Sequence, residues 1–222
     1  MTPADVSVII PTLNEEAQIA ESINSAFNAG AKEVIVVDGG SSDKTLVTAS
    51  DTRAKFLSSK PGRGAQLNCG FQAATGKYVL FLHADNRLSE DCLQQVCDAD
   101  DPVWGAFQQA IQANGVLYRW LERGNAARVK LRRMPFGDQA VFVRTDTLRE
   151  IGGVAELPLM EDVDLAQRLR RIAPPLLLPG PVSVDARRWQ KRGVIRQTAR
   201  NWFIQIAHTC GVSPQRLRTW YR

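Results

Sequence analysis

Three short runs of apolar residues, each followed at once by polar residues, constrain the fold of this chain most strongly. The runs are residues 6–10, 34–37 and 78–82, and almost every side chain in them is apolar. Such runs are typical of strands that are buried on both faces of a parallel sheet. Helical patterns separate the runs, so the β-α-β-α order predicts right-handed crossovers and a parallel sheet.

The polar residues that end these runs are of types that bind ligands. They are Thr12 and Glu15 after the first run, Asp38 after the second, and His83 and Asp85 after the third. In open α/β sheets, ligands bind in the crevice outside the carboxyl ends of the strands. A carboxylate beside an imidazole can hold a hard divalent cation there, and an acid such as Asp38 can bind a ribose hydroxyl or a base edge. Two plainer interpretations stay open: Asp85 caps a helix, or Asp38 belongs to a tight turn.

Local signals place helices between the strands. Asn14 is predicted to be the N-cap of the first helix, which has acids in its first turn and ends at Gly30. The second helix is predicted to start with Asp43 or a neighbouring serine as its cap. Glycines flank Arg63 just before a predicted helix over residues 65–74, which favours an anion site, with a solvated loop arginine as the alternative.

The charge of the chain is divided unevenly. The net charge is +5, but residues 1–110 carry 8 Lys and Arg against 14 Asp and Glu, and residues 111–222 carry 20 against 9. A basic half favours nucleic acid, an anionic membrane surface or a phosphorylated ligand as a partner. The sequence has no signature of a nucleic-acid module, and its aromatic residues do not interleave with the basic ones, so nucleic acid is not expected.

Two segments of the basic half are predicted to be amphipathic helices. In residues 115–134, one packed face is suited by Leu117, Trp120, Leu121 and Ala127, which would leave the many charges on a solvated face. The tail over residues 194–210 is predicted to pack on the body of the protein. Contact of this tail with a second copy of the chain or with a membrane surface stays open.

Two clusters of charged residues in the same half are candidate functional sites. Glu161, Asp162 and Asp164 open a predicted helix, where the macrodipole favours acids. Three acids in four residues exceed what capping needs, so one of them is a candidate general base. Residues 185–192, DARRWQKR, combine four cations with a tryptophan, which suits an anion, with a surface patch as the alternative.

Composition narrows the class of protein. With 44% hydrophobic and 23% charged residues, the 222-residue chain is typical of one large globular domain or a domain with an appendage. No apolar run approaches the ~18 residues of a membrane span, and the N-terminus lacks the features of a signal peptide. The four cysteines form no CxxC pair, so we expect reduced thiols and a cytoplasmic protein, with peripheral contact at the inner membrane face left open.

An ordered set of motifs resembles the series found in family 2 glycosyltransferases with the GT-A fold. The motifs are VSVIIPTLNEE, VVDGGSSD, GRGAQLNCG, YVLFLHAD, FGDQAVFV and MEDVDL. The resemblance runs from Val6 to Trp189. The compact length, HADN in place of DxD and RRWQ near the end are similar to a small soluble bacterial subgroup, the radical-SAM/selenodomain-associated transferase 2 proteins.

The resemblance implies a fold and a division of the chain. The expected fold is α/β of the GT-A, Rossmann-like type, with a mostly parallel central sheet flanked by helices and a C-terminal helical tail. Residues 1–190 would form the transferase domain, with residues 1–110 as the nucleotide-binding half and residues 111–190 as the acceptor half. Residues 191–222 would form a helical extension.

The resemblance also implies a reaction: inverting transfer from a nucleotide-sugar, most often a UDP-sugar, to an unidentified acceptor hydroxyl, with Mg²⁺ or Mn²⁺. The positions that match the donor site are Thr12, Glu15, Asp38, Arg63, Arg188 and Trp189. His83 and Asp85 match the metal motif, with His83 at the place of its first acid. Asp162, with Glu161 beside it, matches the catalytic base. The leading glutamine of the QxxRW element is absent, so a processive polymerase is not expected.

Two other functions are weighed against this one. A nucleotidyltransferase also uses a Rossmann-like sheet and Mg²⁺, but it needs a glycine-rich, lysine-containing loop after the first strand, where this chain has PTLNEE. The same loop lacks the dinucleotide fingerprint GxGxxG. A non-catalytic protein that docks on membranes through residues 111–222 would show salt-sensitive binding to lipid and no affinity for nucleotides.

Overall fold

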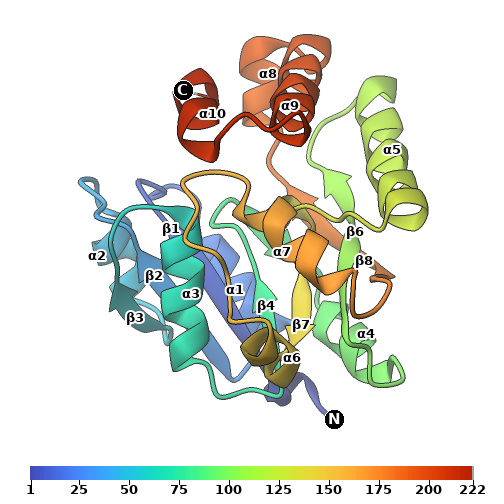
Figure 1. Cartoon of the computed structure of the whole chain (residues 1–222). Helices are drawn as coiled ribbons and strands as arrows, with labels where there is room; N and C mark the ends of the chain where they lie inside the picture. Colours follow the sequence, from blue (N-terminus) through green and yellow to red (C-terminus); the bar gives the residue numbers. More distant parts are fainter. Residues whose placement is uncertain (222) are drawn as a thin grey trace.

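The computed structural model of the chain describes residues 1–221 and contains one sheet with helices on both of its faces (Figure 1). Within these residues the sheet has eight strands in the order β3-β2-β1-β4-β7-β6-β8-β5. The strands are β1 Val6–Thr12, β2 Glu33–Asp38, β3 Lys55–Ser58, β4 Tyr78–Phe81, β5 Asn86–Leu88, β6 Trp104–Ile111, β7 Phe142–Arg144 and β8 Leu176–Val184. The helices are α1 Ile19–Asn28, α2 Thr45–Ser50, α3 Arg63–Ala73, α4 Cys92–Asp98, α5 Val116–Arg132, α6 Thr145–Glu150, α7 Glu161–Leu169, α8 Arg187–Arg192, α9 Val194–Thr209 and α10 Pro214–Tyr221.

The sheet is parallel in its first half and mixed in its second. Strand β1 pairs in parallel with β2 and β4, and β2 pairs in parallel with β3. Strand β7 runs antiparallel to both β4 and β6, whereas β8 is parallel to β6 and antiparallel to β5. The parallel arrangement predicted for the three apolar runs is therefore confirmed. Their carboxyl ends meet at one edge, which gives the polar residues after them a common location.

Alternate side chains of the strands build two core layers. In β1, Val8 and Ile10 belong to the core layer that includes residues of α1 and α4, whereas Ile9 belongs to the layer that includes residues of α3 and α7. Successive side chains of a strand point to opposite faces, so a run without polar residues buries apolar surface in both layers. Figure 1 shows α3, α6 and α7 in front of the sheet and α1 behind it.

The prediction that Asn14 caps the first helix is wrong. Asn14 has a left-handed backbone (φ 55°), and α1 begins later, at Ile19. Its side-chain oxygen accepts a hydrogen bond from Ser42 N at 2.9 Å, so this residue joins the loops after β1 and β2. The prediction that Asp43 or a serine is the cap of the second helix is also wrong, because Lys44 occupies the N-cap of α2. Asp43 stands one residue earlier, and its carboxylate accepts a hydrogen bond from Thr45 N at 2.9 Å. Asn tolerates the left-handed region better than most residues, which suits it to this turn.

The predicted packed face of the basic helix is also wrong. In α5 only Val129 is buried, and the side chains of Leu117 and Trp120 are exposed. Helix α5 contacts the β6 region largely through polar groups. Asn125 donates to the side chain of Gln109 at 2.6 Å, and Ile111 N donates to Glu122 at 2.6 Å. The apolar stripe of α5 therefore faces away from the protein core.

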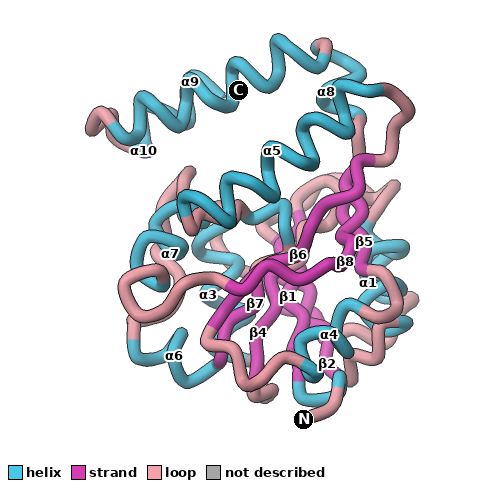
Figure 2. The backbone as a smooth tube through the Cα atoms, turned by 90° about the vertical axis from the view of Figure 1, so that its right-hand side faces the viewer, coloured by secondary structure: helices cyan, strands magenta, loops and turns pink. Residues whose placement is uncertain are grey.

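The three C-terminal helices lie over the carboxyl edge of the sheet. Figures 1 and 2 both show α8, α9 and α10 at the end of the molecule opposite the N-terminus. Ile204 of α9 and Leu217 of α10 are buried with Met160 and Val163 at the start of α7. The predicted packing of the tail on the body is confirmed. Among residues 1–221, no helix combines the length and the apolar character that a membrane crossing requires.

Gln66 fixes the relative position of the first two strand ends. Its side chain is buried on α3, and Nε2 donates hydrogen bonds to the carbonyl oxygens of Thr12 (2.7 Å) and Val37 (2.8 Å). Two adjacent parallel strands are thus held by one amide at the point where their polar tips begin. The sequence gives no signal for this role, because the two acceptors are backbone atoms.

Replacing Gln66 with Ala is expected to destabilise the protein by about 1–3 kcal/mol, because two buried carbonyl groups lose a donor. Urea unfolding followed by circular dichroism measures this change. Gln72→Ala is the matched control, because Gln72 lies exposed on the same helix and should change the free energy of unfolding by less than about 0.5 kcal/mol. Equal unfolding midpoints for the two variants would contradict the role given to Gln66.

Candidate active site

A cavity of about 170 Å³ lies between the carboxyl edge of the sheet and the C-terminal helices. Six of the predicted site residues line it: Arg63, His83, Asp85, Asp162, Arg188 and Trp189. Glu161 lines a smaller pocket beside it, together with Arg63 and Asp162. The cavity lining does not include Thr12, Glu15 or Asp38. The chain thus brings residues from four separate motifs to one cavity.

Thr12 and Asp38 stand side by side at the ends of β1 and β2. They are register partners in the parallel ladder, and both are buried. The Asp38 carboxylate accepts hydrogen bonds from the backbone N–H groups of Gly40 (2.9 Å) and Ser41 (3.0 Å), which orders the turn. The Thr12 hydroxyl is buried and has no hydrogen-bond partner among the described residues. A buried polar group of this kind is costly unless something binds to it.

Arg187 joins Glu15 to Asp85, and sequence reasoning missed it. Its Nη2 donates to both carboxylate oxygens of Glu15 (2.8 and 2.7 Å) and to Asp85 Oδ2 (3.1 Å). The guanidinium Nε lies 3.9 Å from a carboxylate oxygen of Asp185. Three acids from the two halves of the chain therefore surround one cation. The cluster DARRWQKR signals an anion site, but nothing in it distinguishes Arg187 from its neighbour Arg188.

Arg63 and Glu161 form an ion pair between the starts of α3 and α7. Glu161 is buried with 1% of its side chain exposed, and Arg63 Nε is hydrogen-bonded to Glu161 Oε1. Burial raises the pKa of Glu161, and the charge of Arg63 opposes that rise. Glu161 therefore positions Arg63 at the cavity, whereas its neighbour Asp162 lines the cavity itself.

Asp162 is held as an ionised carboxylate. Oδ2 accepts a hydrogen bond from Gly137 N, and Oδ1 accepts one from Val163 N, each at 2.9 Å. Burial alone would raise the pKa of Asp162, but its charged and hydrogen-bonded neighbours, Arg63 and Gly137 foremost among them, together hold the pKa below its ordinary value. A carboxylate has about four acceptor positions, so these two bonds leave room for a further donor.

Position 137 requires glycine, because the side chains of His83 and Asp162 leave little room for a Cβ atom there. A Cβ atom at this position would lie 2.9 Å from His83 Nε2 and 3.4 Å from Asp162 Oδ2. The turn that carries Gly137 is supported by Arg128, which donates to Gln139 Oε1 at 2.8 Å and stacks on the ring of Phe136. Burial lowers the pKa of Arg128 to about 10, so this guanidinium stays charged at neutral pH.

His83 is a neutral imidazole in the cavity wall. Burial, followed by the charge of Arg63, lowers its pKa to about 4. Its Nε2 lies 3.5 Å from Arg63 Nη1, so this ring nitrogen faces the Arg63 side of the cavity. Asp138, which sequence reasoning gave no role, lines the same cavity and has a buried carboxylate oxygen, Oδ1, without a partner in the described chain.

The residues around Asp85 fit a divalent cation that takes most of its ligands from elsewhere. Within residues 1–221, no group of three or more His, Cys, Asp and Glu side chains is arranged to hold a metal ion. Mg²⁺ sites commonly use one or two carboxylates together with substrate phosphates and water, and Asp85 meets that requirement. His83 fits less well because its Nε2 faces a guanidinium.

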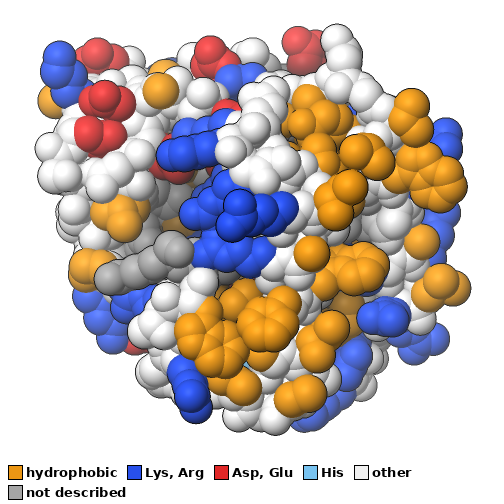
Figure 3. All heavy atoms as spheres, turned by 90° about the horizontal axis from the view of Figure 1, so that it is seen from above, with side chains coloured by type: hydrophobic (Ala, Val, Ile, Leu, Met, Phe, Trp, Pro, Cys, Tyr) orange, Lys and Arg blue, Asp and Glu red, His pale blue; other side chains and the backbone are white. Residues whose placement is uncertain are grey.

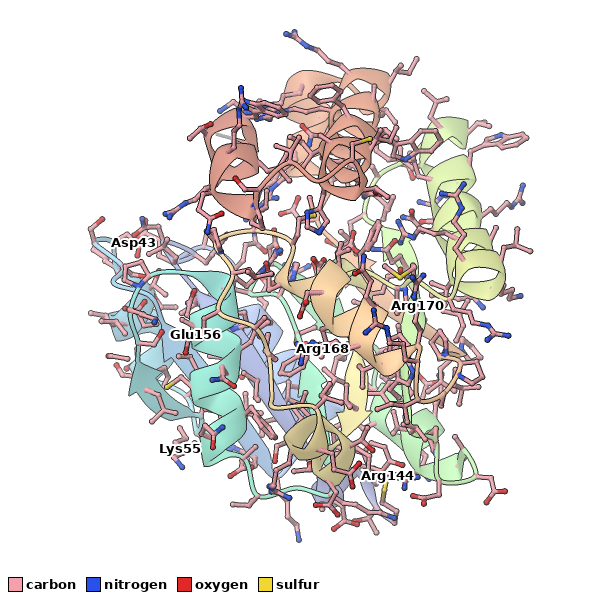
Figure 4. The ribbon with its side chains drawn as sticks, in the orientation of Figure 1. Asp43, Lys55, Arg144, Glu156, Arg168 and Arg170 are labelled. Atoms are coloured by element: carbon pink, nitrogen blue, oxygen red, sulfur yellow. The ribbon has the colours of Figure 1, made fainter. Side chains whose placement is uncertain are left out.

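The last turn of α7 is tied to the loop over residues 151–153, which precedes the helix in the chain. Arg168, which Figure 4 shows on α7, donates through Nη1 to the carbonyl oxygens of Ile151 (2.9 Å) and Gly153 (2.8 Å). Its Nε donates to Asp164 one turn earlier at 2.8 Å. Asp164 is therefore engaged in holding the helix and its loop, and Glu161 pairs with Arg63. Of the three acids predicted at this helix start, Asp162 alone lines the larger cavity.

Comparison with known proteins identifies related sequences. The profile of Glycosyl transferase family 2 matches residues 7–149. A PGL/p-HBAD biosynthesis glycosyltransferase of Mycobacterium bovis is 30% identical over 162 residues, which cover 66% of this chain and 61% of that protein. An uncharacterized glycosyltransferase of Rickettsia conorii is 27% identical over 192 residues, which cover 76% and 32%. The chain thus spans between about a third and three-fifths of the length of these relatives.

Solved structures share the fold at lower sequence identity. S. aureus TarS 1-349 is 22% identical with a TM-score of 0.67, over 84% of this chain and 61% of that chain. A structure of TarS 1-349 in complex with UDP-GlcNAc is also similar, with a TM-score of 0.66. Glucosyl-3-phosphoglycerate synthase from Mycobacterium tuberculosis, in complex with Mn²⁺, UDP-glucose and phosphoglyceric acid, is 20% identical with a TM-score of 0.57, over 81% and 69%. These likenesses confirm the expected GT-A fold.

Replacing Arg63 with Met is expected to cost about 3 kcal/mol in the free energy of unfolding, because Glu161 stays buried without its partner. Burial already raises the pKa of Glu161, and losing Arg63 raises it further. A raised pKa favours the protonated carboxyl, so the variant should lose more stability near pH 8 than near pH 5. Urea unfolding at the two pH values measures this difference.

Lys60→Met is the matched control for this prediction. Lys60 forms an ion pair with Glu156, and both side chains are largely exposed. An exposed pair contributes at most about 1 kcal/mol, so this variant should change stability little at either pH. A pH-independent effect of Arg63→Met, or an equal effect of both variants, would show that Glu161 does not depend on Arg63.

Proposed function

The chain belongs to the family 2 glycosyltransferases, and on this premise we propose that it transfers a sugar from a UDP-sugar to an acceptor hydroxyl with inversion at the anomeric carbon. The observation that carries the proposal is one cavity lined by Asp85, Asp162 and Arg63 at the carboxyl edge of the sheet. Family membership favours this reaction over nucleotidyl transfer and over a non-catalytic role. The UDP-sugar complexes of TarS and of glucosyl-3-phosphoglycerate synthase support the choice of donor.

The donor spans the turn after β2 and the cavity. Asp38 and the unpartnered hydroxyl of Thr12 bind the nucleoside at the ends of β1 and β2. The cavity of about 170 Å³ then takes the diphosphate and the sugar, with Arg63 and Arg188 as the cations nearest the charge of the diphosphate. Trp189 offers an apolar wall beside them. Glu15 acts through Arg187, which it orients with two hydrogen bonds.

Asp85 would hold a divalent cation together with oxygens of the diphosphate. When bound, Mg²⁺ or Mn²⁺ supplies electrostatic stabilisation of the diphosphate as it leaves. Arg187 already contacts Asp85 Oδ2, so the other oxygen of this carboxylate is the one that would be free for a cation. Neutral His83 is the weaker candidate for a second ligand.

Asp162 is the general base of the proposed reaction. The acceptor hydroxyl gives its proton to the Asp162 carboxylate, the acceptor oxygen bonds to the anomeric carbon, and the electron pair of the breaking C–O bond goes to the diphosphate. Because attack and departure occur on opposite faces in one step, the anomeric centre inverts. Glu161 is a positioning residue, since its carboxylate is paired with Arg63.

The subgroup, the location and the domain divisions are parts of the same proposal. HADN and RRWQ support the proposed assignment to the radical-SAM/selenodomain-associated subgroup. A cytoplasmic location and the divisions at residues 110 and 190 also stay predictions. The proposed acceptor is a molecule that offers a hydroxyl group.

Calorimetric titration tests the donor site. UDP is expected to bind, and to bind more tightly with Mn²⁺ than without it, because the cation links the diphosphate to Asp85. Asp85→Asn should remove the gain from Mn²⁺ and leave the metal-independent part of the affinity. If neither UDP nor any other nucleoside diphosphate binds with or without Mn²⁺, the proposed function is wrong.

Asp162→Asn separates binding from chemistry. The variant is expected to keep its affinity for UDP-sugar but to hydrolyse or transfer the sugar roughly 10²–10⁴-fold more slowly, because the attacking oxygen loses its base. Release of UDP from UDP-glucose and UDP-GlcNAc measures the rate. Asp164→Asn is the matched control on the same helix, since Asp164 pairs with Arg168. Unchanged turnover in Asp162→Asn would remove Asp162 from the role of base.

A further inference from the structure

The exposed large apolar side chains are concentrated on the C-terminal half of the protein. Among the described residues, nine of the fifteen exposed large hydrophobic side chains lie on α5, α9 and α10. They are Val116, Leu117, Trp120 and Leu131 on α5, Ile195, Trp202, Phe203 and Ile206 on α9, and Trp220 on α10. We call these nine residues the apolar face. Scattered apolar residues are normal on a surface, but a gathered set marks an interaction site.

Helix α9 buries one large apolar side chain, Ile204, but the rest of the side that faces the cavity is mostly polar. Gln197, Asn201 and Gln205 follow helical spacing along its inner side and line the cavity. Trp202 and Phe203 lie on the outer side with 65% and 59% of their surface exposed. A surface helix normally turns its apolar stripe to the core and its polar side to water. The outer side of α9 therefore exposes apolar surface to water, and contact with an apolar phase would bury that surface.

Helix α5 repeats this arrangement next to α9. Its exposed stripe includes Leu117 and Trp120, the latter with 66% of its surface exposed. The side that faces β6 is held by the polar contacts of Glu122 and Asn125. Figures 1 and 2 show α5 and α9 as neighbours at the same end of the molecule. Two adjacent helices thus expose aromatic and aliphatic side chains on their outer sides.

Positive charge accompanies the apolar face, and α8, α9 and α10 carry no acid to compensate it. After Asp185 the chain contains nine Lys and Arg and no Asp or Glu. Exposed cations stand beside the apolar residues on the same helices, among them Arg123 and Lys130 on α5 and Arg196 on α9. Figure 3, which views the molecule from above, shows hydrophobic side chains gathered on one face with Lys and Arg between and around them. A partner that complements this face therefore has an apolar interior and an anionic surface.

An anionic lipid bilayer has both of these properties. Interfacial helices place Trp, Phe and aliphatic residues at the boundary of the acyl chains while Lys and Arg meet the headgroups. A second copy of the chain fits less well, because a two-fold contact would bring the cationic helices α8, α9 and α10, which carry no acid, close to their own copies. We propose that the apolar face docks the protein on a membrane that contains anionic lipids, with α9 lying in the plane of the headgroups.

The docked orientation has a consequence for the cavity. The inner side of α9 lines the cavity and the outer side would contact lipid, so only the thickness of one helix, roughly 10 Å, separates the two. The proposal does not depend on the donor or on the chemistry of the cavity. Binding to vesicles in the absence of nucleotide therefore tests it independently of the proposed function.

Co-sedimentation with vesicles tests the docking. The full chain is expected to bind vesicles of phosphatidylcholine mixed with phosphatidylglycerol, and to bind phosphatidylcholine alone much more weakly. Trp202→Ser with Phe203→Ser should lower the partition coefficient on mixed vesicles by roughly tenfold or more. Lys191→Gln with Arg196→Gln should lower it roughly fivefold for each charge removed and weaken its dependence on salt.

The matched control is Leu46→Ser with Val47→Ser on α2, which removes exposed apolar side chains from the acidic half. This variant should bind vesicles like the unaltered chain. All three double variants change exposed positions, so their thermal unfolding midpoints should stay close to that of the unaltered chain. Such midpoints exclude misfolding as the cause of lost binding.

Three outcomes would overturn the proposal. The first is no binding of the unaltered chain to anionic vesicles, and the second is binding that Trp202→Ser with Phe203→Ser leaves unchanged. The third concerns sedimentation velocity without lipid. If the unaltered chain sediments as a dimer and this variant as a monomer, and neither binds vesicles, the apolar face is an interface between two copies of the chain.

Discussion

The ion pair between Glu161 and Arg63 is the interaction on which the candidate site depends. It joins the first residues of α3 and α7, which belong to halves of the chain with opposite net charge. A buried carboxylate is costly unless a cation meets it, so these two helix starts cannot separate without exposing or neutralising that charge. Asp162 follows Glu161 directly and is therefore carried to the cavity wall. The paired acid fixes the backbone, and its neighbour stays available to a ligand.

Arg187 extends the same principle to Asp85 and Asp185, which also line the cavity. One guanidinium meets the carboxylates of Glu15 and Asp85, and Asp185 lies at a longer distance. Acids that converge at a strand edge repel one another unless a cation stands between them. The arginine provides that cation from the start of α8, and so ties the C-terminal helices to the loop after β1. The site is thus organised by ion pairs that form with the fold, before any ligand arrives.

Sequence reasoning succeeded where the signal was local. The apolar runs predicted β1, β2 and β4 because burial on both faces leaves no polar position in a strand, and the polar tips followed from the parallel order. It failed for Asn14, because a residue suited to cap a helix is equally suited to a left-handed turn. Gln66 and Arg187 gave no signal, since their partners lie far away in the sequence. The antiparallel pairing of β7 depends on equally distant contacts.

The failure for α5 has a different cause, which α9 makes clear. An amphipathic pattern states that a helix has two unlike faces, but it does not state which face the rest of the protein covers. In both helices the protein covers a side that is mostly polar, with Ile204 of α9 and Val129 of α5 as buried apolar residues. The covered side meets the cavity in α9 and polar groups of β6 in α5. Polar inner contacts leave the apolar stripes outside. The pattern that predicts a packed helix in an ordinary domain therefore indicates an exposed apolar surface at this end of the molecule. Such a surface is suited to an interaction.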